Sequence, residues 1–148
     1  MDSLHQVGIK ASPETIYEAL TEQSGIKSWW SEHTEAEPTV GGMNEVSFYG
    51  GMAVFKLRNE ALEKGEKVVW TVDDGPPPWV GTEITWTLSP GEGPAEGQTV
   101  LDFAHRGLNL LEGPFASINY TWGWYLTSLK FYMEKGKGTP HTDADMVS

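Results

Sequence analysis

The order of the elements that the sequence predicts constrains the fold most: a helical region near each end of the chain, with strands between them. Residues 11–20 read Ala-Ser-Pro-Glu-Thr-Ile-Tyr-Glu-Ala-Leu, in which Ser12 is a favourable N-cap and Pro13 occupies the first helical position. Residues 26–30 add a second short helical piece that ends in two tryptophans. This order favours a sheet that grips the C-terminal helix around an apolar space.

The C-terminal helix is indicated by a stripe of large side chains that begins at Ile118. The stripe continues at helical spacing through Trp122, Tyr125, Leu126, Leu129, Tyr132 and Met133. Gly136 and Gly138 then end the helix. Trp124 and Phe131 lie on the opposite side of this helix. Either loops cover these two rings, or they form an exposed apolar patch suited to a homodimer.

Alternation of apolar and polar residues predicts strands through the middle of the chain. We expect them at residues 4–10, 45–49, 53–62, 68–72, 82–88 and 99–105. Short turns join most of these strands, whereas the prolines at 76–78 require a loop. Consecutive strands with short turns are typical of an antiparallel meander that packs one of its faces.

Length and charge limit the class of protein. The 148 residues suit one domain, which we expect to span residues 1–140, with 141–148 as a flexible tail. The net charge of -11, without a cluster of Lys or Arg, argues against binding to nucleic acid. There is no cysteine, no secretory leader pattern and no apolar stretch long enough to insert into a membrane. We therefore expect a soluble, cytoplasmic protein without disulfides.

Large apolar side chains are the candidate binding residues, because the strand alternation or the helical spacing directs them inward. These residues are Trp30, Phe48, Phe55, Trp70, Trp86, Phe103, Tyr125 and Leu129. They either fill a solid core or line a pocket for an apolar ligand. Trp79, which follows the three prolines, can gate the mouth of such a pocket or simply fix its own loop.

His105 is the polar candidate, because it shares a strand face with Leu101 and Phe103. It can anchor a ligand oxygen or transfer a proton, or it can be a hydrogen-bonded structural histidine. The chain contains no nucleophile elbow, phosphate-binding loop or dinucleotide fingerprint. Its histidines also lack the spacing of metal ligands. We therefore expect no catalytic residues, no cofactor and no metal.

Several segments together resemble a known superfamily. They are residues 11–20, the Trp29-Trp30 pair, Thr99-Val-Leu-Asp-Phe-Ala-His-Arg-Gly-Leu108, and the ending from Gly123-Trp124 to Gly136-Lys-Gly-Thr-Pro140. The chain is similar to the SRPBCC (START-like) superfamily, in the branch of activator of heat-shock-protein-90 ATPase homologues. The resemblance implies an α+β helix-grip fold, in which a curved antiparallel sheet wraps around a long C-terminal helix. Two short N-terminal helices would close one end.

The superfamily includes lipid carriers, hormone receptors, polyketide cyclases and co-chaperones, so the fold alone does not decide the function. The first hypothesis is binding of a small hydrophobic or aromatic molecule in a cavity between the C-terminal helix and the sheet. The second is a co-chaperone-like interaction module with a chaperone partner. A third is a cyclase, dehydratase or hydrolase that uses His105 in the same cavity.

Overall fold

The computed structural model describes residues 1–143, in which seven strands form one antiparallel sheet. The strands are β1 (Ser3–Ile9), β2 (Thr34–Ala36), β3 (Met43–Phe48), β4 (Ala53–Glu63), β5 (Lys67–Asp74), β6 (Glu83–Pro90) and β7 (Thr99–Arg106). Across the sheet they follow the order β1-β7-β6-β5-β4-β3-β2. Strands β2 to β7 are therefore a meander, and β1 adds to its far edge beside β7.

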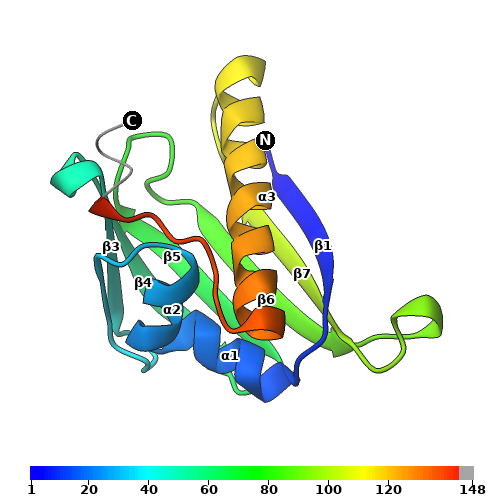
Figure 1. Ribbon diagram of the computed structural model, residues 1–148. Helices are drawn as coiled ribbons and strands as arrows, with labels where there is room; N and C mark the ends of the chain where they lie inside the picture. Colours follow the sequence, from blue (N-terminus) through cyan, green and yellow to red (C-terminus); the bar gives the residue numbers. More distant parts are fainter. Residues whose placement is uncertain (144–148) are drawn as a thin grey trace.

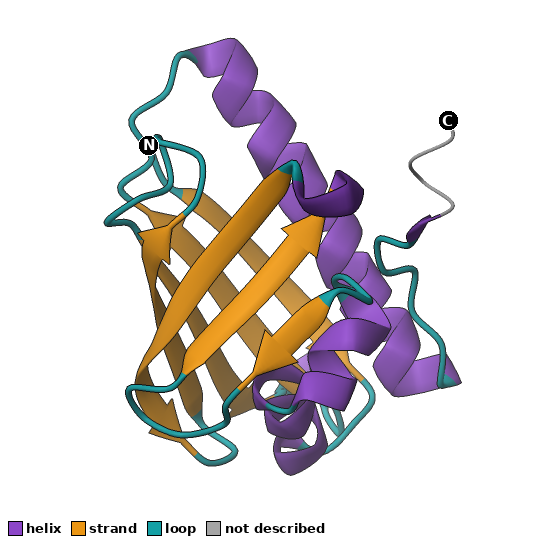
Figure 2. Ribbon diagram, turned by 90° about the vertical axis from the view of Figure 1, so that its left-hand side faces the viewer, coloured by secondary structure: helices purple, strands orange, loops and turns teal. Residues whose placement is uncertain are grey.

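Three α-helices and two short 3₁₀ turns complete the described chain. They are α1 (Pro13–Thr21), α2 (Gln23–Trp29), α3 (Glu112–Lys135), η1 (Tyr49–Gly51) and η2 (Gly93–Ala95). Figure 1 shows α3 lying across one face of the sheet, with α1 and α2 near its C-terminal end. The turned view in Figure 2 shows that the sheet is curved, with α3 packed against it. The expected helix-grip fold is confirmed. None of the helices within residues 1–143 combines the length and apolarity of a membrane span.

Local sequence explains where the helices begin and end. Ser12 caps α1, since its Oγ accepts a hydrogen bond from the backbone N–H of Thr15 at 3.2 Å. Helix α3 starts at Glu112, earlier than the apolar stripe predicts. Pro114 lies in its first turn, where the missing N–H costs no helical hydrogen bond. Gly136 ends α3 with a left-handed backbone, φ 78°.

The predicted strands are confirmed, with ends that shift by a few residues. Strand β2 was not predicted, because three residues are too few to show an alternation. The pairing of β4 with β5 shifts register between Asn59 and Ala61. Such a bulge adds an unpaired residue, and Glu60 there lies exposed.

The segment after α3 returns along the domain. The backbone N–H of His141 donates to the carbonyl of Trp30 at 2.8 Å, and the carbonyl of His141 accepts from the N–H of Glu32 at 3.0 Å. Nearer to α3, the N–H of Thr139 donates to Ser128 Oγ at 2.7 Å. Residues 141–143, expected to belong to a flexible tail, therefore lie against the connection between α2 and β2. Residues 144–148 of that tail lie outside the described residues.

Candidate functional site

The space between α3 and the sheet is filled by aromatic side chains. The indole of Trp30 is stacked between those of Trp29 and Trp70, with ring centroids 5.6 and 5.7 Å apart. Trp86 meets Trp70 edge-on at 5.3 Å, and Phe103 at 4.8 Å. The indole N–H groups of Trp70 and Trp86 have no hydrogen-bond acceptor within the described chain. This part of the molecule matches the packed-core interpretation of the sequence.

Above this core, two adjoining pockets of about 170 and 80 Å³ open between α3, η1 and the loop that joins β5 to β6. We call the two together the rim pocket. Its lining residues are Trp30, Phe48, Tyr49, Ala53, Phe55, Trp79, Ile118, Thr121, Trp122 and Tyr125. Most of these side chains are aromatic and none carries a charge. Such a surface suits an uncharged, apolar or aromatic molecule.

The rim pocket contains only part of the set that the sequence suggests. Trp30, Phe48, Phe55 and Tyr125 line it. The other candidates are almost completely buried in the core below, and none of them lines the rim pocket: Trp70, Trp86, Phe103, His105 and Leu129.

Several residues of the rim pocket are not in the predicted set. Tyr49 comes from a turn, and Thr121 is an exposed residue beside the apolar stripe of α3. Neither position has a recognisable sequence signal. Trp79 has one, since it follows three prolines, and its ring lies 4.6 Å from that of Phe55. Trp79 lines both parts of the pocket, as do Trp30, Thr121 and Tyr125.

His105 connects α3 to the loop that carries Trp79. Its Nδ1 accepts a hydrogen bond from Trp122 Nε1 at 3.1 Å, so this nitrogen carries no proton. Thr82 Oγ1 donates to the carbonyl of Trp79 at 2.5 Å and must accept from His105 Nε2, 2.8 Å away. These partners assign a neutral imidazole with its proton on Nε2. Both ring nitrogens are thus used within the protein.

The electrostatics of His105 agree with this assignment. The residue is fully buried. Burial lowers the pKa of the imidazole from 6.5 to about 4, against a smaller opposing effect from the charge of Asp2. The ring therefore stays neutral near pH 7. In this arrangement it holds Trp122 and the Trp79 loop in place, as the structural interpretation of His105 expects.

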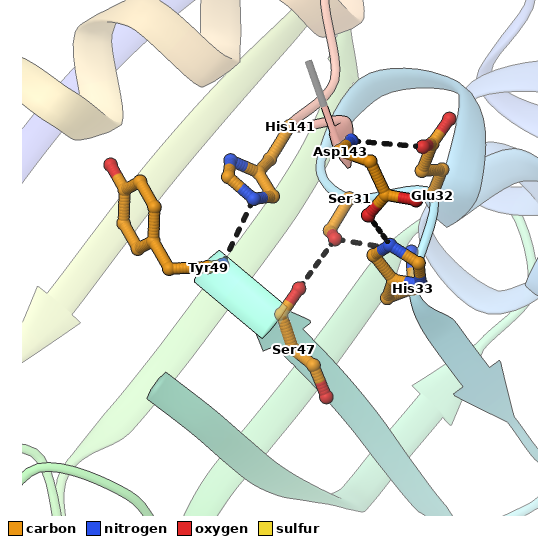
Figure 3. Close-up of polar contacts among 7 residues, drawn as sticks. All are labelled: Ser31, Glu32, His33, Ser47, Tyr49, His141 and Asp143. Atoms are coloured by element: carbon orange, nitrogen blue, oxygen red, sulfur yellow. Dashed lines mark hydrogen bonds and ion pairs between the residues drawn. The ribbon is translucent and has the colours of Figure 1, made fainter. Parts of the chain in front are cut away.

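The C-terminal segment supports another wall of the rim pocket. The His141 ring packs on Phe48 at 5.3 Å and on Tyr49 at 4.7 Å, centroid to centroid. Its Nε2 accepts a hydrogen bond from the backbone N–H of Tyr49 at 3.0 Å, as Figure 3 shows. Tyr49 has a positive φ of 53°, which is uncommon for a residue with a side chain. His141 thus fixes a turn whose tyrosine lines the pocket.

The same segment brings Glu32, His33 and Asp143 together. Their ligand atoms lie within 4.8 Å of one another, which is close enough to hold a divalent cation. His33 Nε2 and Asp143 Oδ1 already form a hydrogen bond, and the Asp143 N–H donates to Glu32 Oε1 at 3.2 Å (Figure 3). The His33 and Asp143 side chains are 44% and 70% exposed. These contacts explain the cluster without a cation.

A larger depression of about 800 Å³ lies beside the turn before α1 and two hairpin turns of the sheet. Its lining includes Lys10, Glu66 and Glu96 together with several glycines and prolines. It has no aromatic ring among its lining residues. Because its lining carries charged side chains of both signs and no aromatic ring, it lacks the features that would favour an uncharged aromatic ligand.

Comparison with known structures finds proteins of similar fold that match nearly the whole chain. The Aha1 dimer from Colwellia psychrerythraea is 36% identical, with a TM-score of 0.80, and the match covers 93% of this chain and 99% of that one. Protein SSP2350 from Staphylococcus saprophyticus is 18% identical, with a TM-score of 0.75, over 96% and 98% of the two chains. Protein MLL2253 from Mesorhizobium loti is 20% identical, with a TM-score of 0.75, over 91% and 98%. The latter two show the shared fold.

A search among curated proteins finds no match. The family model described as Activator of Hsp90 ATPase homolog 1-like protein matches residues 10–134, which include α1, α2, the meander and nearly all of α3. This match and the relative from Colwellia confirm the resemblance noted from the sequence. The chain belongs to the family of Activator of Hsp90 ATPase homolog 1-like proteins.

Proposed function

We propose that the protein binds a small, uncharged, aromatic or apolar molecule in the rim pocket. The observation that carries the proposal is the lining: aromatic side chains from five separate parts of the chain converge there, and none of them is charged. Burying an apolar ligand against such rings stabilises the complex by roughly 25 cal/mol per Å² of surface removed from water. The exposed residues Tyr49 and Thr121 add hydroxyl groups to the lining, which suits polar contacts with a ligand.

Thr121 allows a test that leaves the core unchanged. Its side chain lines both parts of the pocket, is exposed, and donates to the carbonyl of Ser117 at 2.9 Å. Thr121→Phe should fill the pocket. Thr127 is the matched control, since it is also exposed on α3 and donates to the Gly123 carbonyl at 2.9 Å, but lies outside the pocket.

The measurement is a calorimetric and thermal-shift titration with 1-naphthol and related uncharged aromatics. We expect the wild type and Thr127→Phe to bind equally, and Thr121→Phe to bind at least about tenfold more weakly, which corresponds to 1.4 kcal/mol. Equal binding by all three proteins would place the ligand elsewhere. No binding by the wild type across the panel would refute the proposal.

A second function, regulation of a chaperone ATPase, is favoured by one specific observation. The relative that bears the name Aha1 shares 36% identity with this chain and matches it along almost its entire length. If the protein acts in this way, adding it to a purified Hsp90-type chaperone should raise ATP turnover, and the two proteins should sediment together. Unchanged turnover without co-sedimentation would exclude this function.

We also propose that two copies of the chain associate. The support is again the relative from Colwellia, whose structure is described as a dimer. Light scattering coupled to size-exclusion chromatography should then give twice the mass of a 16.4 kDa chain. A mass of one chain up to high concentration would refute the dimer.

A further inference from the structure

One face of α3 carries large apolar side chains that stay exposed in the described part of the chain. Tyr120, Trp124 and Phe131 are 74%, 52% and 39% exposed. Successive residues of an α-helix are rotated by about 100°, so these three lie within a narrow stripe. The stripe points away from Trp122, Leu126 and the sheet. Loops therefore do not cover Trp124 and Phe131, which was one of the two alternatives left open by the sequence.

This face also differs from the rest of the protein in charge. The chain has a net charge of -11, so two copies repel one another over most of their surface. Residues 113–129 of α3 contain no Asp, Glu, Lys, Arg or His. Two copies can approach most closely where such a helix meets its counterpart, since no like charges have to be brought together or removed from water.

The charged residues of α3 lie at its ends: Glu112 at the start, and Lys130, Glu134 and Lys135 near the end, where Lys130 and Glu134 pair with each other at 3.6 Å. Glu112 is its first residue, whereas Lys135 is its last and lies over the Phe131 ring, 5.1 Å from the centroid. An antiparallel pair of α3 helices would bring Glu112 of each copy to Lys135 of the other. It would also align the helix dipoles favourably. Trp124 is at the middle of the helix, so the two-fold axis would pass beside it.

We infer that the outer face of α3, formed by Tyr120, Trp124 and Phe131, is a self-association surface that pairs antiparallel with α3 of a second copy. This rests on the dimer proposed above and names its interface. Such an interface is isologous, because a two-fold axis brings the same patch of both copies together. Its centre is aromatic and its charged residues lie at the rim, as in stable protein interfaces.

The first test compares two substitutions that add the same charge. Trp124→Glu places a carboxylate near the axis, whereas Val40→Glu places one at another exposed apolar residue, which is 66% accessible and lies in the connection between β2 and β3. In sedimentation velocity runs over a range of concentrations, the wild type and Val40→Glu should be dimers. Trp124→Glu should weaken dimerisation at least about a hundredfold, or 2.7 kcal/mol. Circular dichroism and thermal unfolding confirm that each variant is folded.

The second test addresses the antiparallel order. Glu112→Lys and Lys135→Glu should each weaken the dimer, and the double variant should recover most of the lost affinity, since the exchanged charges face each other again. If the double variant is weaker than either single one, the antiparallel arrangement is wrong.

The outcomes distinguish an error in the proposed interface from an error in the proposed dimer. If the wild type is a dimer and Trp124→Glu does not weaken it, the interface proposed here is wrong, although the protein does dimerise. A wild-type monomer would refute both. If that monomer binds an Hsp90-type chaperone or phosphatidylcholine vesicles through Trp124, the face belongs to another occupant and the inference is overturned.

Discussion

His105 should make the stability of the fold depend on pH in a defined window. Its folded-state pKa is lowered by burial to about 4, whereas in the unfolded chain the imidazole titrates near 6.5. Between these two values the unfolded state binds more protons than the folded one, so the free energy of unfolding decreases as the pH falls. The contribution of the buried, neutral His105 to the free energy of unfolding is fully present above about pH 6.5 and is lost as the pH falls toward 4.

The size of the effect follows from the shift. A difference of one pKa unit corresponds to about 1.4 kcal/mol, so the whole shift corresponds to about 3 kcal/mol. At about pH 5 the folded state is still mostly neutral at His105, whereas the unfolded state is mostly protonated. The loss between about pH 7.5 and pH 5 is therefore roughly 2 kcal/mol.

The assay is urea unfolding followed by tryptophan fluorescence, for the wild type and His105→Gln at several pH values. The glutamine variant starts out less stable, because it cannot contact both Trp122 and Thr82 as the imidazole does. It lacks the titrating ring, whereas all carboxylates are retained. The difference in pH dependence between the two proteins thus isolates His105. If both proteins lose the same free energy of unfolding on acidification, the assignment of His105 as neutral and buried is wrong.

Three further substitutions test the packing. Trp70→Ala should lower the free energy of unfolding by about 3–5 kcal/mol, since the residue is fully buried; a loss below 1 kcal/mol would contradict the stacked core. Thr82→Val should cost about 1–3 kcal/mol, because the Trp79 carbonyl and the His105 N–H lose their partner; urea unfolding without a change would argue against that network. Gly136→Ala should lower the free energy of unfolding by about 1 kcal/mol, because residue 136 has a positive φ. Gly113→Ala, in the first turn of α3, is the control and should not destabilise the protein. Melting curves of the two variants measure the difference.

Much of the fold was predictable because its signals are local. Ser12 and Pro13 mark the start of α1, and alternation in β6 places Ile84, Trp86 and Leu88 on the buried face. Such patterns depend on neighbouring residues of the same element. The first turn of α3 was missed because its Gly and Pro disfavour a helix by propensity, although a first turn tolerates both.

The candidate site was less predictable, because its residues meet only through tertiary contacts. Alternation shows that Trp70 and Phe55 point inward but does not show which of them reaches an opening. Trp70 is completely buried, whereas Phe55 lines the rim pocket beside Trp79. His141 was assigned to a tail because its neighbours are polar. Its burial comes from residues more than 90 positions away, the rings of Phe48 and Tyr49, which no sequence window contains.

The stack of Trp29, Trp30 and Trp70 has an optical consequence. The ring planes of Trp29 and Trp30 differ by 4°, and those of Trp30 and Trp70 by 2°. The ring centroids of Trp86 and Trp122 lie within 5.5 Å of rings in this stack. Indoles so close together share their electronic excitation, so these rings contribute to the fluorescence and the aromatic circular dichroism as a group, alongside the separate signal of the exposed Trp124. A ligand that touches Trp30 in the rim pocket would therefore alter the spectrum of rings that it never contacts, which gives a label-free signal of binding.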